Sequence, residues 1–472
     1  MKNKTKYFKA AGLLLVIVML LSLLTACGSA PVVTPTDPSQ APASASRVPA
    51  QNTEAPTQST DPAVRPTASE DPVPVRWAEK MSVRKTESIA QALNASSFDE
   101  RFLAFLSEHT EGNYMASPLS FRYALGLLLA GANGETKAEL LNALGVSSEE
   151  EWIASCLDFN GFVEYFASDL EREIAEYQAM QKQGWIPQDS PAPFRALRIA
   201  NSVWKAERIT EDFTAAYRES VEKNYAAEYR YFTPESAVEK INEWADIKTE
   251  HMIPKLLPDD YPTTQLAIVL MNALYFKDSW VTSFAEYLTQ EGDFHARSGQ
   301  TTKKDFMTVE DQFSYYEDKD TQLVILPMKG GVSMAFVLGS TEGLAEKISG
   351  AGSENVKVTI PKLDLETSFS GGELVNFLKE YGVQLAFDGE RADFSAMIDY
   401  PVFVSDIIQK TRIKLDEEGV EAAAVTAIMF EECAYIEPQQ PKVFTADRPF
   451  SFYIYTTCND TTAILFAGEI VE

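Results

Sequence analysis

A short, almost uninterrupted apolar run from Leu266 to Phe276 constrains the fold more than any other stretch of this chain. It has the length of a β-strand and is apolar on both faces, which is typical of a strand buried inside a sheet. The run therefore predicts a fully buried central strand. Asn272 is the single amide within it. An unsatisfied amide in a core costs roughly 1 to 3 kcal/mol, so Asn272 is expected to have hydrogen-bond partners.

Further strands are predicted, but they do not alternate with helices. Apolar and β-branched runs indicate them at Ala200–Trp204, Val324–Pro327, Val332–Leu338, Val356–Lys362 and Phe452–Tyr455. Apolar residues at helical spacing indicate an amphipathic helix over Phe98–Ser107. Ser117 followed by Pro118 is typical of a capped helix start. A mixed pattern without strand–helix–strand repeats predicts an α+β fold.

The first 26 residues have the pattern of a secretory signal. Lysines at positions 2, 4, 6 and 9 precede an apolar run from Ala11 to Leu21. The ending Leu24-Thr25-Ala26-Cys27 resembles a bacterial lipobox, which implies cleavage before Cys27 and lipid attachment to its thiol. An uncleaved membrane anchor is the alternative, but the run is shorter than the roughly 20 residues that a span needs. Either way, the rest of the chain is expected at the extracellular face of the membrane.

Residues 27–80 are dominated by Pro, Ser, Thr and Ala, with few large apolar side chains. Such a segment buries too little apolar surface to offset the entropy lost on ordering. It is expected to be a disordered tether of roughly 40 Å r.m.s. length, since a flexible chain spans about 5 to 6 Å × √n. The folded domain is expected to occupy residues 81–472.

Composition argues against several functions. The formal net charge is −28 and the pI about 4.6, so nucleic-acid phosphates would be repelled. After Cys27 only Cys156, Cys433 and Cys458 remain, with no metal-ligand spacing; a Cys156–Cys458 bridge is left open. The three histidines lie in no catalytic motif. We expect no cofactor, no metal, no enzymatic activity and a monomer.

The stretch Glu417–Tyr435 has two conflicting periodicities. Its Ala-rich first part favours a short surface helix. Its alternation instead favours a strand, because every second residue from Val420 is small at first and larger and apolar later. That alternating set is Val420, Ala422, Ala424, Thr426, Ile428 and Phe430.

The order Glu-Glu-Gly-x-Glu-Ala-Ala-Ala-x-Thr in this stretch resembles the hinge of the serpin family. The resemblance implies an exposed reactive-centre loop that, once a protease cuts it, inserts as a new strand into a large central mixed sheet. It also implies smaller sheets and about eight to nine helices. Small alanines suit a strand that passes between two others. The hinge residues are Glu417, Gly419, Val420, Glu421, Ala422, Ala423, Ala424 and Thr426.

Other segments match the same family in order along the chain. They include Asn113 to Ser120, Leu266 to Trp280, and Phe444 to Phe450. In the family, an Asn, two serines and a His lie beneath the point where the sheet opens. The resemblance assigns this sheet-opening cluster to Ser117, Ser120, Asn272, Trp280 and, in place of the His, Gln409. Glutamine both donates and accepts hydrogen bonds, so it can still satisfy the cluster.

The hypothesis is therefore an inhibitory serpin on a lipid tether, which traps its target protease covalently. Hinge spacing puts the reactive bond at Cys433–Ala434, with Tyr435–Ile436 as second choice. No Lys or Arg lies between Glu417 and Pro441, so a trypsin-like target is disfavoured. Elastase-, chymotrypsin- or subtilisin-like proteases, or a cysteine protease, are expected instead. A non-inhibitory serpin acting as a surface binding module is the alternative, and an extracellular hydrolase using Cys433 is a third hypothesis.

Overall fold

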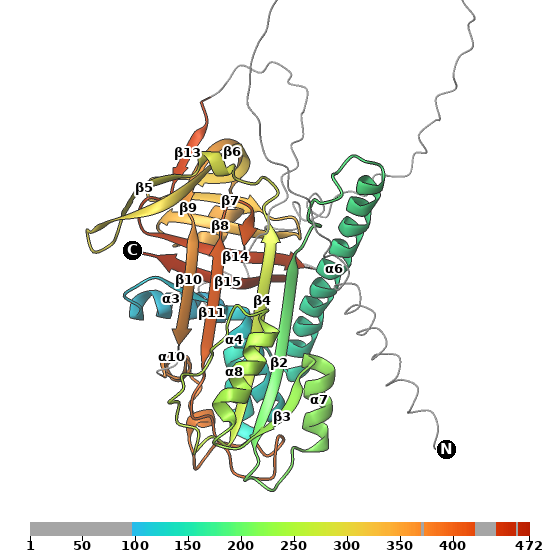
Figure 1. Ribbon diagram of the computed structural model, residues 1–472. Helices are drawn as coiled ribbons and strands as arrows, with labels where there is room; N and C mark the ends of the chain where they lie inside the picture. Colours follow the sequence, from blue (N-terminus) through green and yellow to red (C-terminus); the bar gives the residue numbers. More distant parts are fainter. Residues whose placement is uncertain (1–96, 370–371, 421–439, 459–460) are drawn as a thin grey trace, which may run out of the picture. The chain divides into compact units, whose positions relative to one another are not determined.

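The computed structural model describes residues 97–369, 372–420, 440–458 and 461–472. These ranges contain eight α-helices (Figure 1). They are α3 (Phe98–His109), α4 (Pro118–Gly131), α5 (Gly134–Leu144), α6 (Glu149–Lys182), α7 (Ala215–Tyr225), α8 (Ala237–Lys248), α9 (Leu344–Ser349) and α10 (Glu373–Glu380). Two short 3₁₀ helices are η1 (Glu286–Leu288) and η2 (Leu385–Phe387). None of the helices in these ranges combines the length and apolar character needed to cross a bilayer.

One sheet has six strands in the order β10-β11-β12-β4-β2-β3. Its strands are β2 (Ala196–Ala206), β3 (Glu228–Phe232), β4 (Ile268–Ser279), β10 (Leu363–Phe369), β11 (Gln409–Leu415) and β12 (Gly419–Val420). β2 and β3 pair in parallel and the other neighbours pair antiparallel, so the sheet is mixed. β12 lies between β11 and β4 and has only two residues.

The second sheet has nine strands. Eight follow the order β1-β15-β14-β8-β7-β6-β9-β13, and β5 pairs with β6. Its strands are β1 (Tyr114–Ala116), β5 (Gln290–His295), β6 (Thr301–Glu317), β7 (Thr321–Pro327), β8 (Val332–Gly339), β9 (Gly352–Pro361), β13 (Lys442–Thr445), β14 (Phe450–Cys458) and β15 (Thr461–Ile470). The predicted α+β class and all five predicted strands outside the central run are confirmed.

The predicted central strand is confirmed as β4, but it is not fully buried. Met271, Leu274 and Phe276 are buried, whereas the residues from Ile268 to Leu270 are only partly so. β4 pairs with β2 along one edge, and β12 covers only the last two residues of the other edge. The remaining edge has no strand beside it among the described residues, which leaves these side chains half-covered.

Helix α4 packs behind the six-stranded sheet and α8 lies across its front (Figure 1). As the sequence predicts, Ser117 caps α4: its Oγ accepts a hydrogen bond from the Ser120 N–H at 3.1 Å. Small residues let α4 approach its neighbours closely. A Cβ at Gly131 would lie 2.7 Å from Met397, and one at Gly126 would lie 2.2 Å from Trp152. The helix under the sheet is therefore tightly fixed.

Candidate functional site

The two residues of β12 enter the six-stranded sheet between strands that are otherwise separate. Gly419 lies opposite Ser279 on β4, and Val420 lies between Asp278 on β4 and Leu415 on β11. β12 is antiparallel to both neighbours, so β4 and β11 run parallel to each other. Val420 is buried with its side chain in the core. The hinge thus begins a strand for which the sheet has a position.

Gly419 is required by the close approach of β12 to β4. A Cβ on Gly419 would lie 2.1 Å from the backbone oxygen of Asp278. Trp280 fixes the preceding turn from its own side: its backbone N–H donates to the Glu418 oxygen at 2.9 Å and its Nε1 donates to the Asp416 oxygen at 3.1 Å. Trp280 is 1% exposed and therefore packs beneath the hinge.

Glu417 is held by an ion pair and a hydrogen bond. The Nζ of Lys362 lies 2.8 Å from Glu417 Oε1, and Thr289 Oγ1 donates to the same oxygen at 2.6 Å. Burial acts to raise the pKa of Glu417, but the hydrogen bonds from Lys362 and Thr289 outweigh it, so the pKa is lowered. Glu417 is 5% exposed and stays ionised at neutral pH. This contact fastens the hinge to the segments that follow β9 and η1.

Asp278, the β4 partner of Val420, is a buried carboxyl group. Its Oδ2 accepts from the Gly330 N–H and its Oδ1 from the Ser279 N–H, both at 2.8 Å. Burial raises the pKa of Asp278 to about 7, opposed in part by these bonds and by the charge of Arg195. The Asp278–Gly330 bond joins the six-stranded sheet to the turn between β7 and β8. A titrating group therefore lies at the mouth of the strand position.

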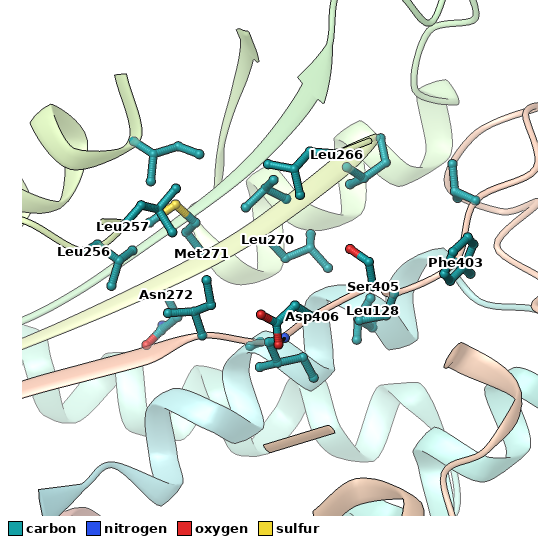
Figure 2. A pocket seen from close by; sticks show the side chains of 18 of the residues that line it. Leu128, Leu256, Leu257, Leu266, Leu270, Met271, Asn272, Phe403, Ser405 and Asp406 are labelled. Carbon is teal, nitrogen blue, oxygen red and sulfur yellow. Dashed lines mark hydrogen bonds between the residues drawn. The ribbon is translucent and has the colours of Figure 1, made fainter. Parts of the chain in front are cut away.

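Below β12 the space between β4 and β11 changes in width. A narrow cavity of about 20 Å³ lies next to Val420, lined by Leu274, Phe276 and Ile413 among others. A larger one of about 90 Å³ follows, bounded by α4, α8, β4 and residues 402–408. Figure 2 shows this larger cavity with Asn272 at one end and Phe403 at the other. The empty strand position is thus tight near the hinge and wide further away.

The residues of the predicted sheet-opening cluster are only partly brought together. The Gln409 side chain makes two 2.9 Å hydrogen bonds to the backbone of Ser117, accepting from its N–H and donating to its oxygen. Ser120 bonds Ser117 through the helix cap. Asn272 does not join them: its Nδ2 donates to Asn201 Oδ1 at 2.7 Å. The glutamine that replaces the family's histidine is fully satisfied.

Comparison with known proteins identifies the family. The profile described as "Serpin (serine protease inhibitor)" matches residues 94–472, which is most of the chain. The chain belongs to the serpin family.

Relatives cover nearly the same length. An uncharacterized serpin-like protein of Thermococcus kodakarensis is 28% identical over 86% of this serpin and 91% of its own length. The leukocyte elastase inhibitor of Equus caballus is 31% identical over 78% and 95%, respectively. Among solved structures, Serpin48 of the insect Tenebrio molitor aligns with a TM-score of 0.61 and 27% identity, covering 82% of this serpin and 98% of that chain.

Several predicted site residues of this serpin lie outside the described residues. These are Cys27, the hinge residues after Val420 (Glu421, Ala422, Ala423, Ala424 and Thr426) and both candidate reactive bonds, Cys433–Ala434 and Tyr435–Ile436. Cys156 is a free, buried thiol, so it forms no bridge to Cys458, and burial raises its pKa to about 12.

Sequence reasoning missed three residues that hold the hinge of this serpin: Lys362, Thr289 and Asp278. No local pattern identifies Lys362 or Thr289, because each lies far along the chain from Glu417. Asp278 did carry a signal, since an acid at the end of an apolar run predicted to be buried needs partners as much as Asn272 does.

Proposed function

We propose that this serpin inhibits a protease by offering its loop as a substrate and then inserting the cut loop into the six-stranded sheet. The protease nucleophile attacks the carbonyl carbon of the scissile bond, the amine leaves with a proton, and an acyl-enzyme forms. Insertion of the freed strand then carries the enzyme away before water hydrolyses the ester. The uncut protein must be kinetically trapped above its energy minimum.

The register of β12 is the observation that carries this proposal. Continued past Val420, it would place Ala422 between Phe276 and Ile413, and Ala424 between Leu274 and Thr411. Both alanines share the inward face with buried Val420, because side chains alternate along a strand. They would enter the narrow cavity of about 20 Å³, where larger side chains would clash.

The same register would bring larger residues to the wide cavity. Ile428 would lie between Leu270 and Ile407, and Phe430 between Ile268 and Ser405. All four of those flanking residues line the cavity of about 90 Å³. The change from small to large side chains along the loop thus follows the change from narrow to wide along the sheet. A chance resemblance at the hinge would not produce this agreement.

In this proposal, Thr426 would arrive between Asn272 and Gln409. The Asn272 Oδ1 is buried and accepts no hydrogen bond among the described residues. A threonine hydroxyl would be a suitable donor. The amide that the sequence marks as needing a partner would receive it on insertion.

The proposed target prefers a small, uncharged or aromatic residue. Cleavage at Cys433–Ala434, or else Tyr435–Ile436, would suit an elastase-, chymotrypsin- or subtilisin-like enzyme, or a cysteine protease. The relative named leukocyte elastase inhibitor supports the first of these classes. We further propose that a lipid on Cys27 and the tether 27–80 hold a monomeric domain 81–472 at the extracellular face of the membrane.

A gel assay tests the proposal. The purified domain is incubated with pancreatic elastase, chymotrypsin, subtilisin and papain, and the products are run under denaturing conditions. Inhibition predicts a complex that survives denaturant, and mass spectrometry of the released peptide gives the cut bond. Clean cleavage by every enzyme, with no gain in thermal stability of the cut protein, would instead support the non-inhibitory surface binding module.

A further inference from the structure

The wide cavity between β4 and residues 402–408 is a preformed apolar space in the uncut protein. Its volume of about 90 Å³ is several times what one water molecule requires. Leu270 and Ile407 flank it, Leu128 of α4 lies on one face and Ile241 of α8 on the other. It is therefore bounded by two strand-like segments and two helices, which gives it the shape of a slab. A flat ring suits such a space.

One end of the cavity is polar in a specific way. Asn272 lies there (Figure 2), and its Nδ2 is already used by Asn201. Its Oδ1 is buried without a donor among the described residues. An unpaired acceptor in such a place costs roughly 1 to 3 kcal/mol. A ligand with one O–H or N–H group would remove that cost.

The rest of the lining does not favour charge. The carboxyl group of Asp406 already accepts from Tyr261 Oη at 3.2 Å and from the Ile407 N–H at 2.8 Å. Phe403, at the opposite end of the cavity, is 49% exposed and marks a route from solvent. A charged ligand would lose its hydration at this site without a free partner of opposite sign.

We infer that the uncut serpin binds a small uncharged aromatic molecule with a single hydrogen-bond donor, of the phenol class, in this cavity with its donor on Asn272 Oδ1. The site is distinct from the reactive bond and needs no protease. Its consequence for inhibition rests on the proposed function: the ligand would occupy the place that Thr426 and Ile428 need, so insertion would slow and more loops would be cut without trapping.

The experiment compares two ligands that differ only in the donor. Millimolar phenol is expected to raise the melting temperature of the uncut domain by about 2 °C, as binding to the native state requires. Anisole, which has the same ring but no donor, is expected to raise it by less than half as much. Equal shifts with the two ligands, or none, would overturn the inference.

Two matched variants locate the binding. Ala124→Leu extends a side chain of α4 that lines the cavity and should abolish the phenol shift. Ala104→Leu makes the same change on α3, beside a different pocket, and should leave it intact. Loss of the shift in both variants or in neither would place the ligand elsewhere. Asn272→Leu should abolish the preference for phenol over anisole.

A second measurement separates this inference from the proposed function. In the elastase assay, phenol should raise the number of serpin molecules consumed per enzyme trapped about twofold, a factor of about 0.4 kcal/mol in partitioning. If no protease is ever trapped but phenol binds as described, the ligand site stands and the inhibitory function fails. If trapping occurs but phenol does not bind, the inference alone fails.

Discussion

Val420 lies opposite Asp278 on β4, so the hinge enters the six-stranded sheet in one defined register. That register determines which side chains of a cut loop would face the core and which would face solvent. It also places the hinge beside a buried carboxyl group and an ion pair. Four predictions follow from these relationships, and each separates a functional role from simple loss of folding.

Arginine at an inward position should convert the inhibitor into an ordinary substrate. Ala422→Arg and Ala424→Arg would force a cation against Phe276 and Leu274, and burying an unpaired charge prevents insertion. We expect at least a tenfold loss of denaturant-stable complex, seen by gel, with cleavage retained. Ala423→Arg, on the outward face, is the matched control and should still trap. Trapping by all three variants would refute the inward–outward assignment.

The hydroxyl of Thr426 should stabilise the cut form but not the uncut form. Thr426→Val keeps the shape and removes the proposed donor to Asn272, so the cut protein should lose about 1 kcal/mol in guanidinium unfolding. The uncut protein should be unchanged. Thr426→Ser, which keeps the hydroxyl, should restore most of the effect. An identical loss in both forms would show a role unrelated to insertion.

The Lys362–Glu417 pair should stabilise the uncut hinge. Lys362→Met leaves Glu417 half-paired, and because Lys362 is partly exposed we expect a modest loss of about 1 to 2 kcal/mol in urea unfolding at pH 7. Lys442→Met breaks the exposed Lys442–Glu317 pair and should cost much less. Since the pKa of Glu417 is lowered, the pair's contribution should disappear as pH falls below the ordinary glutamate value of 4.5. Equal losses in the two variants would contradict a special role for the hinge pair.

Asp278 should make the uncut protein less stable as pH rises. Its folded pKa of about 7 is above the unfolded value of 3.8, so the folded state binds more protons between those values. Stability should therefore fall from pH 5 to pH 8, by at most about 1.4 kcal/mol per unit from this group. Asp278→Asn should flatten the urea midpoint over this range. Asp293→Asn, at an exposed acid whose pKa is lowered, should leave the slope unchanged.

Much of the architecture could be predicted from local patterns. The apolar run around Met271 predicted β4, and the Ser117–Pro118 pair predicted the start of α4. In each case the signal depends on neighbouring residues: period-two or continuous apolarity for a strand, and cap chemistry for a helix. The degree of burial of β4 was predicted wrongly, because it depends on whether a strand lies alongside, which the run itself does not record.

The hinge motif from Glu417 to Val420 was equally readable, since Gly419 is dictated by chemistry that travels with the sequence. Its surroundings were not. Lys362, Thr289 and Asp278 are brought to the hinge from three other segments, and Asn272 pairs with Asn201 and not with the residues grouped with it. The sequence by itself therefore determined the elements, the family resemblance and the small-to-large order of the loop. Only the tertiary structure decided which distant side chains hold the hinge and where the sheet is narrow or wide, because those contacts depend on how strands far apart in the chain are placed against one another.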